Sequence, residues 1–358
     1  MNYSRKFDFL IPFAIFIIGS LSLAILWSLN LDFFANQAIF LVIGFLLFFL
    51  FAKIDFKIFE NIPWFLYFGS LILLALTFLF GQISRGASRW LEIGIFTFQP
   101  SEIVKPFLIL FAAKFFSEIE FQKKKKLFLL ALALLVPIFL ILKQPDLGSS
   151  LVITSSFLGI LLASKVNWRW LFLGLVIAGF FLPLSWHFLA DYQKTRITSF
   201  LSPGTDALGA GYNQIQAIIT VGSGKIFGRG LGRGTQSHFA FLPEHQTDFI
   251  FASLAEELGF VASFLLLFFY GLIAFRILKI AQKTVSDYGR LVCIGIFSML
   301  CFQTFINIGM NMGIVPVTGI TLPLVSAGGS SVISWMICLG IVEAVATTEK
   351  QEEALEIR

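Results

Sequence analysis

Residues 9–29 read FLIPFAIFIIGSLSLAILWSL and decide the class of this protein. The stretch contains no charged side chain, and a helix of about 20 apolar residues is long enough to cross a bilayer. It is too long for the apolar core of a signal peptide, and no small-residue cleavage motif follows it. The stretch therefore predicts a membrane-spanning helix that stays in the chain.

The composition of the whole chain points to the same class. Of 358 residues, 57% are hydrophobic, 45 are Phe and only 13% are charged, whereas about a quarter of the residues in soluble domains are charged. These numbers exclude a soluble enzyme, a disordered chain, a disulfide scaffold and a conventional nucleic-acid binder. Cys293, Cys301 and Cys338 lie in apolar runs, which predicts that they pack in the core.

The predicted fold is an all-α integral membrane protein with ten transmembrane helices in a single domain over residues 1–358. The apolar segments are continuous rather than alternating, which favours helices over membrane strands. They lie approximately at 9–29, 37–54, 62–81, 100–118, 127–143, 148–165, 168–189, 248–277, 290–312 and 322–346.

The distribution of Lys and Arg predicts the orientation. With the N-terminus in the cytoplasm, most of the 26 Lys and Arg residues fall in cytoplasmic loops, as membrane proteins prefer. Both termini are then cytoplasmic, and residues 190–247 form one large extracellular loop between the seventh and eighth helices. A loop of this length is usually functional. Within it, residues 215–221 predict a short amphipathic helix.

Two motifs at the outer ends of predicted helices contain ionisable residues. In Gln99–Pro106 (QPSEIVKP), Glu102 and Lys105 are three residues apart and share a helix face. They are either a structural ion pair or part of a polar cavity. In residues 143–150 (KQPDLGSS), Asp146 either caps the following helix or directs its carboxylate to the same cavity.

A third motif, residues 242–251 (LPEHQTDFIF), opens the eighth helix. Thr247 or Asp248 would serve as its N-cap. Asp248 also has a placement suited to a general base, since burial at the membrane lip would raise its pKa. Glu256 and Glu257 follow inside the apolar helix. They are interpreted as structural, with Lys or Arg on a neighbouring helix as the expected partner.

A fourth stretch is rich in Gly and Ser, from Asn307 through Gly319 to the segment 322–331 (LPLVSAGGSS). This composition predicts close helix contacts or an interrupted helix. Its amides and hydroxyls, including those of Ser326 and Ser330, equally suit phosphate oxygens. By contrast, residues 228–234 (GRGLGRG) are not a nucleotide loop, because no strand precedes them. The three His residues have no metal-ligand spacing.

The four motifs in this order resemble the RodA/FtsW family, the SEDS peptidoglycan polymerases. The matching residues are 86–90 (GASRW), 99–102 (QPSE), 144–148 (QPDLG), 241–244 (FLPE), 247–252 (TDFIFA) and 255–259 (AEELG). Residues 234–237 (GTQS) resemble the RodA branch, which acts in cell elongation, more than the FtsW branch, which acts in division. In three places the chain departs from the family pattern, one of them being the region after Gly228, which lacks the acidic or bulky residues of some members. Ala327 replaces a common Tyr, and His245 is separated from Thr247 by Gln246.

The resemblance implies a lipid II polymerase on the outer face of the bacterial cytoplasmic membrane. The 4-hydroxyl of an incoming lipid II attacks the anomeric carbon of the growing glycan, and undecaprenyl pyrophosphate leaves. Asp248 matches the general base. Lys105, Arg89 and Arg196 are candidates to bind the pyrophosphate, with Glu102 holding Lys105 or binding a cation. A divalent cation, Mg²⁺ or Mn²⁺, is the other means of stabilising the leaving group, and no organic cofactor is implied.

The implied partners are lipid II, a class B penicillin-binding protein that cross-links the glycan, and the elongation machinery. Nucleic acid is not among them. The alternatives are an FtsW-type septal polymerase and a lipid II flippase. A flippase is expected to place its charges near the bilayer midplane. Glu102, Asp146 and Asp248 instead map to the predicted outer end, which favours chemistry there.

Overall fold

The computed structural model describes residues 7–84, 87–93, 96–118, 124–167, 186–188, 190–202, 210–239 and 241–356, with positions 169, 174, 176 and 179. Its elements are α1 (Leu10–Leu29), α2 (Leu31–Lys53), α3 (Phe56–Asn61), α4 (Pro63–Phe80), β1 (Gln82–Ser84), β2 (Ala87–Ile93), β3 (Phe96–Phe98), α5 (Pro100–Ile103), α6 (Lys105–Glu118), α7 (Lys124–Lys143), α8 (Leu147–Ala163), η1 (Trp186–Phe188), α10 (Asp191–Leu201), α11 (Ala210–Ser223), α12 (Thr235–His238), α13 (Ile250–Lys283), α14 (Asp287–Asn311) and α15 (Gly329–Glu356).

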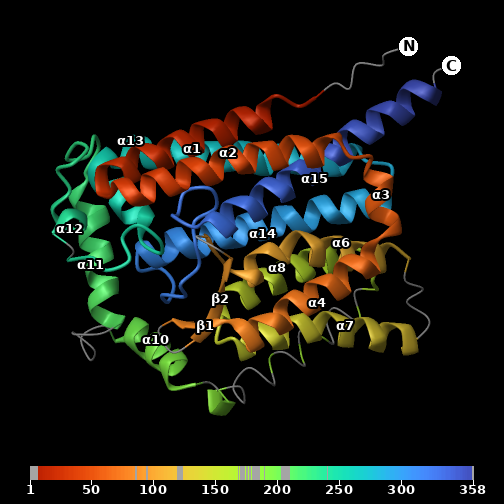
Figure 1. Cartoon of the computed structure of the whole chain (residues 1–358), viewed down its shortest axis with the longest axis horizontal. Helices are drawn as coiled ribbons and strands as arrows, with labels where there is room; N and C mark the ends of the chain where they lie inside the picture. The colour runs from red at the N-terminus through yellow and green to blue at the C-terminus, as the bar shows by residue number, and fades with distance from the viewer. Residues whose placement is uncertain are drawn as a thin grey trace.

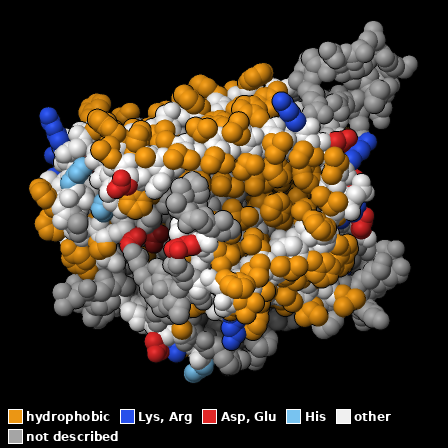
Figure 2. Space-filling model, viewed as in Figure 1, with side chains coloured by type: hydrophobic (Ala, Val, Ile, Leu, Met, Phe, Trp, Pro, Cys, Tyr) orange, Lys and Arg blue, Asp and Glu red, His pale blue; other side chains and the backbone are white. Residues whose placement is uncertain are grey.

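Long apolar helices form the body of the molecule. Within the described residues, six are long and apolar enough to cross a membrane, namely α1, α2, α4, α13, α14 and α15. Figure 1 shows them running along one common direction, with the start of α1 and the end of α15 at one end of the bundle and α11 and α12 at the other. Figure 2 shows a broad band of hydrophobic side chains over the middle of one face. The predicted seventh segment, 168–189, lies almost entirely outside the described residues.

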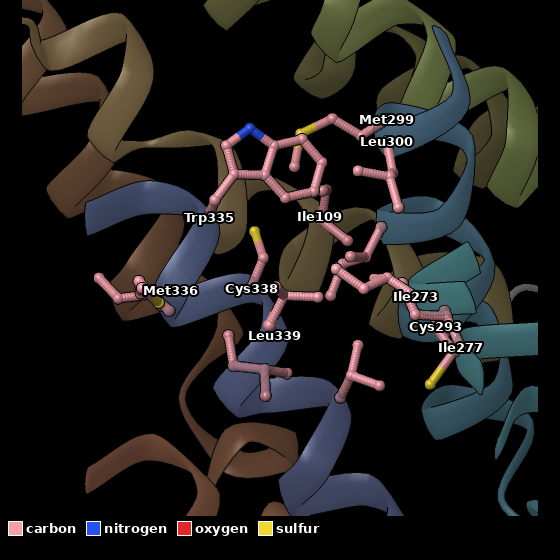
Figure 3. Packing of buried hydrophobic residues seen from close by; sticks show 14 of the residues in the cluster. Ile109, Ile273, Ile277, Cys293, Met299, Leu300, Trp335, Met336, Cys338 and Leu339 are labelled. Atoms are coloured by element: carbon pink, nitrogen blue, oxygen red, sulfur yellow. The ribbon is translucent and has the colours of Figure 1, made fainter. Parts of the chain in front are cut away.

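The core lies around α15, which packs along α2 and also contacts α13, α14 and α6. Figure 3 shows Trp335, Cys338 and Leu339 of α15 on the side of labelled residues from α6, α13 and α14. Trp335 is 1% exposed and is one of the largest fully buried side chains. Cys293 and Cys338 are buried, but Cys301 is exposed, so the prediction that all three pack in the core is wrong for Cys301. Its sulfur lies on the outer surface of an apolar helix.

A small antiparallel sheet, in the order β1-β2-β3, makes the all-α prediction incomplete. In its register Ile83 pairs with Ser88, and Glu92 pairs with Thr97. The segment between the third and fourth predicted helices contains short runs of strand-forming residues separated by glycines at 86 and 94, a pattern that favours hairpins. The sheet carries Arg89 and Trp90 to the wall of a cavity described below.

Helix α13 is interrupted at Gly259, where φ is 74° and ψ is −169°. The interruption frees backbone groups, and the segment 225–230 pairs with them. The amides of Phe260 and Val261 donate to the carbonyls of Lys225 and Ile226 at 3.0 and 3.1 Å. The eighth predicted segment is therefore two helical pieces joined by a break. Buried backbone groups need hydrogen-bond partners, and the segment 225–230 supplies them at this break.

The glycines of residues 228–234 permit this approach. A Cβ on Gly228 would lie 2.1 Å from the carbonyl oxygen of Glu257, and φ at Gly228 is +77°. The amides of Arg229 and Gly230 donate to the carbonyls of Glu256 and Glu257, each at 2.9 Å. Only a residue without a Cβ fits such a close backbone contact at positive φ. The glycine-rich segment therefore closes the broken helix.

Helix starts differ from the sequence expectation at two places. Helix α2 begins at Leu31 rather than near residue 37, because the side chain of Asn30 accepts from the amides of Asp32 and Phe33. Helix α15 begins only at Gly329, not at residue 322. The residues before it form a loop in which Leu324 has a φ of 63°. This loop reaches the site described next.

Candidate active site

A polar cavity of about 670 Å³ lies where five separate parts of the chain meet. Six of the eight predicted site residues line it, namely Arg89, Glu102, Asp146, Arg196, Asp248 and Ser330. The other two, Lys105 and Ser326, are both 1% exposed and are not among the lining residues. The cavity thus joins motifs that are up to 241 positions apart in the sequence, counted from 89 to 330.

Glu102 and Lys105 form a buried ion pair in which Nζ of Lys105 contacts Oε1 of Glu102. Glu102 is 6% exposed and lines the cavity, while Lys105 lies behind it. The hydroxyl of Ser149 also donates to Oε1 of Glu102, at 3.5 Å. The two residues form a buried ion pair, and the carboxylate of Glu102 also lines the polar cavity, so the two interpretations of this motif hold together.

Asp146 both caps a helix and lines the cavity. Its Oδ1 accepts from the amide of Ser149 at 3.0 Å, which is the N-cap bond of α8. Its Oδ2 accepts from the side chains of Gln99 and Ser101, each at 2.8 Å. These bonds hold the start of α5 against the start of α8. The capping and cavity alternatives are therefore combined in one carboxylate.

Arg89, on β2, is bound to the turn before α8. Its Nε donates to the carbonyl of Gln144 at 2.9 Å, and its Nη2 donates to the carbonyl of Pro145. The side chain of Gln144 in turn donates to the carbonyl of Leu74 on α4 at 2.9 Å. The guanidinium of Arg89 therefore positions the turn that carries Asp146 and also contributes positive charge to the cavity wall.

Asp248 lies just before α13. That helix begins at Ile250 with Phe249 at the N-cap position and no side-chain cap bond, so the prediction that Thr247 or Asp248 caps it is wrong. A Cβ on Gly319 would lie 3.4 Å from Oδ2 of Asp248 and 3.8 Å from Nη1 of Arg196. The carboxylate and the guanidinium thus converge on Gly319, on one part of the cavity wall.

The serines of the segment 322–331 have different contacts. Oγ of Ser326 donates to the carbonyl of Thr247 at 2.6 Å and accepts from the amide of Leu322 at 2.7 Å. Oγ of Ser330 accepts from the amide of Gln99 at 2.8 Å and lines the cavity. Ser326 therefore holds the backbone beside Asp248, whereas Ser330 is part of the wall at the N-terminus of α15.

Glu256 and Glu257 are both fully buried, but their partners are not the predicted basic residues of a neighbouring helix. Glu256 accepts from the amides of Gln236 and Ser237 and from the Ser237 hydroxyl, at 3.0, 3.2 and 2.8 Å. Glu257 contacts Ser28 at 2.6 Å and His238 at 2.7 Å. The nearest cation in an ion pair with Glu256 is Arg229 of the loop, at 3.9 Å. The amides and hydroxyl of the short helix α12, with Ser28 of α1 and His238 of α12, take the place of the predicted Lys or Arg.

The comparisons with known proteins agree with this architecture. The family model for FtsW, RodA and SpoVE, described as "Cell cycle protein", matches residues 5–351. The chain belongs to this family.

Curated members of the family are similar over most of their length. The peptidoglycan glycosyltransferase MrdB of Escherichia coli is 44% identical over 301 residues, which are 84% of this chain and 81% of that protein. Stage V sporulation protein E of Bacillus subtilis is 42% identical over 272 residues, covering 73% and 72%.

Solved structures of the family have the same fold. A chain from a study of how a peptidoglycan synthase complex coordinates polymerization and crosslinking has a TM-score of 0.85 at 32% identity, with 97% of this chain and 99% of that chain covered. Rod shape determining protein RodA of Thermus thermophilus has a TM-score of 0.72 at 30% identity, covering 97% and 98%.

Two of the departures from the family motifs, at Ala327 and His245, have distinct positions in this member of the family. Ala327 lines the cavity, so the absence of a Tyr side chain leaves space there, and its amide donates to the carbonyl of Gln246 at 3.0 Å. His245 is not among the lining residues. Its Nδ1 contacts the carbonyl of Leu242 at 2.9 Å and its Nε2 contacts the side chain of Gln246 at 3.0 Å. Burial lowers the pKa of His245, and the bond to Leu242 partly opposes this.

Several residues of the cavity and its support stand in the quoted motifs but were given no individual role there. Gln99, Glu244, Thr318 and Thr321 line the cavity, and Asn307 and Asn311 hold the backbone of Asp248. The sequence signal for Asn307 and Asn311 was an amide side chain at each position of an otherwise apolar helix, because buried polar groups in a membrane need partners. Thr318 stands in the Gly- and Ser-rich stretch without a role of its own, and Thr321 lies between the two quoted segments.

Proposed function

We propose that this cavity joins lipid II units into a glycan strand, with Asp248 as the general base. The chain is a peptidoglycan glycosyltransferase of the bacterial cytoplasmic membrane, as the curated members of its family are named. The observation that carries the assignment of the base is the convergence of the Asp248 carboxylate and the Arg196 guanidinium on Gly319 in a polar cavity.

In the proposed reaction the 4-hydroxyl oxygen of the acceptor lipid II forms a bond to the anomeric carbon of the donor glycan. The bond from that carbon to the pyrophosphate oxygen breaks, and undecaprenyl pyrophosphate leaves with the electron pair. Asp248 takes the hydroxyl proton. A carboxylate that accepts a proton in the transition state contributes typically a hundredfold to ten-thousandfold in rate.

Positive charge and helix amides serve the leaving pyrophosphate. Arg89 and Arg196 both line the cavity, and so do Ser330 and Ser331 in the first turn of α15. The N-terminus of a helix favours anions because its first amides have no partners within the helix. Asp146 positions the α5 and α8 starts, Glu102 contributes a cavity carboxylate, and Lys105 offsets its charge from behind. Ser326 acts indirectly through the carbonyl of Thr247.

A divalent cation, Mg²⁺ or Mn²⁺, would bind together with the substrate rather than to a ready-made protein site. Among the described residues no group of three or more His, Cys, Asp or Glu side chains is arranged to hold a metal ion. The pyrophosphate oxygens would supply most of the ligands, as is common for Mg²⁺. We therefore derive no step of the mechanism from a cation.

We further propose that the chain crosses the membrane ten times, with cytoplasmic termini and the loop 190–247 outside. Relatives named MrdB support a role in elongation rather than in division. The similarity to a chain from a peptidoglycan synthase complex supports a class B penicillin-binding protein as partner. A cysteine introduced at Phe227, which is 81% exposed, is expected to label from outside intact cells, and labelling only after lysis would reject this orientation.

The test of function is glycan synthesis by the purified protein. Wild type is expected to convert lipid II into glycan polymer, detected on a gel, and the assay is repeated with and without the divalent cation. Asp248→Ala is expected to make no polymer while keeping the melting temperature of wild type. Asp191→Ala is the matched control, because Asp191 is exposed on α10 and is not among the lining residues. Polymer from Asp248→Ala at the wild-type rate would reject the base. Lipid II translocation into vesicles without polymer would favour a flippase.

A further inference from the structure

Two asparagines on α14 are buried where an apolar helix should carry no amide. Asn307 and Asn311 are four residues apart, so they lie on one face of the helix, and both are 0% exposed. A buried amide without hydrogen bonds is destabilising in a protein interior and more so in a membrane protein. The two amide side chains therefore need hydrogen-bond partners within the protein.

Both side chains donate to the same backbone oxygen, the carbonyl of Asp248. The distances from Nδ2 are 3.0 Å for Asn307 and 3.2 Å for Asn311. Oδ1 of Asn311 also accepts from the amide of Ala252, at 3.0 Å, in the first turn of α13. The carbonyl of Asp248 is thus hydrogen-bonded to α14, and the amide of Ala252, four residues later, is hydrogen-bonded to the same helix.

Asn307 also binds the backbone next to Gly319, the part of the cavity wall that lies beside the Asp248 carboxylate. Its Nδ2 donates at 2.7 Å to the carbonyl of Ile320, the residue that follows Gly319. An amide nitrogen has two hydrogens, and here one is directed to each segment. A single side chain therefore fixes the distance between the backbone of Asp248 and the backbone at Gly319, where Asp248 and Arg196 converge.

We propose that Asn307 and Asn311 are positioning residues that hold the Asp248 carboxylate in its reactive geometry against the Gly319 wall. The inference rests on the proposed role of Asp248 as the base. Positioning matters because a misplacement of about 1 Å at a reacting group can lower the rate on the order of a hundredfold. Neither asparagine is among the cavity-lining residues, so neither needs to touch the substrate.

Gln303 supplies a matched control for a merely structural role. It lies one turn before Asn307 on α14, is also 0% exposed, and its Nε2 donates to the carbonyl of Thr321 at 2.9 Å. It thus ties the same helix to the same loop, with the same kind of bond, but has no bond to Asp248. Loss of Gln303 removes structural support without releasing the backbone of the base.

The experiment compares Asn307→Leu, Asn311→Leu and Gln303→Leu in purified full-length protein, with kcat and KM measured for lipid II at a temperature where each variant is folded. We expect kcat to fall about tenfold to a hundredfold in the two asparagine variants, with KM within about threefold of wild type because the lining residues remain. Gln303→Leu should lower the melting temperature while its kcat stays within about threefold. Asn307→Gln, which keeps the donor, should recover part of the loss.

Two results would overturn the proposal. One is a kcat of Asn307→Leu within threefold of wild type, and the other is an equal kcat loss in Gln303→Leu. If the leucine variants do not fold, Asn311→Ser tests the same bond with a smaller side chain, and the same limits on kcat apply. Asp248→Ala is measured in parallel. Activity in that variant would reject the base itself, and is distinguishable from a failure confined to the asparagines.

Discussion

The Oδ2 atom of Asp248 lies 3.4 Å from the position that a Cβ on Gly319 would occupy. Gly319 also has a φ of +74°, a conformation that costs about 1–2 kcal/mol in a residue with a Cβ. The glycine thus leaves the space beside the proposed base free of a side chain.

Gly319→Ala is therefore expected to lose more activity than stability. The added methyl group contacts the carboxylate, so polymer synthesis should fall about tenfold or more, while unfolding free energy falls by only about 1–2 kcal/mol. Rates of polymer formation and melting temperatures measure the two effects. Gly232→Ala is the control, since it has a φ of +75° and open space around its Cβ. Equal activity in the two variants would contradict the expectation.

The buried pair of Glu102 and Lys105 should behave as a unit. Glu102→Gln leaves an uncompensated charge on Lys105, which is 1% exposed, and removal of one partner of a buried pair costs about 3–5 kcal/mol. The double variant Glu102→Gln with Lys105→Met should lose clearly less than the sum of the two single changes. Chemical denaturation in detergent measures this.

Activity in the same variants separates packing from chemistry at Glu102. The double variant should regain stability but not polymer synthesis, because the carboxylate that lines the cavity is still missing. A double variant that is stable and fully active would show that Glu102 serves only to offset the charge of Lys105.

The two arginines of the cavity should differ in their effect on stability. Arg89→Ala removes the donors to the carbonyls of Gln144 and Pro145, and loss of a bond to a buried group such as that of Gln144 costs about 1–3 kcal/mol. We expect a lower melting temperature together with lower activity. Arg196→Ala should lower activity with less change in melting temperature, because Arg196 is only half-buried on α10. A reversed order of melting temperatures would contradict this division.

Replacing Glu256 should lower the stability of the protein more than replacing Glu118. Glu256→Ala leaves the amides of Gln236 and Ser237 and the Ser237 hydroxyl without their acceptor, at a cost of about 1–3 kcal/mol for each buried group left unsatisfied. Glu118→Ala is the control. Its ion pair with Lys114 is exposed, the Glu118 side chain being 65% exposed, and such pairs contribute at most about 1 kcal/mol. Protease resistance of the segment 228–238 should fall in Glu256→Ala alone.

Local pattern predicted the class of the protein and most of its helices. Uninterrupted apolar runs of bilayer length are a property of the chain itself, so α1, α4 and α14 were predictable from composition and length alone. Ionisable residues in such runs stand out for the same reason, and six of the eight predicted site residues do line one cavity. Breaks such as the one at Gly259 were missed, because the loop that satisfies them is about 30 residues away in the sequence.

The sequence by itself determined that this is a membrane protein of the FtsW/RodA/SpoVE family with a small set of carboxylates and arginines in its motifs, since hydropathy and motif spacing are local properties. Tertiary structure alone decided how those residues divide their roles. It placed Lys105 behind Glu102, directed Ser326 to the Thr247 carbonyl and brought the amides of α12 to Glu256. It also set two asparagines on the backbone of Asp248. Each of these contacts joins distant segments, and their geometry arises only when the helices pack.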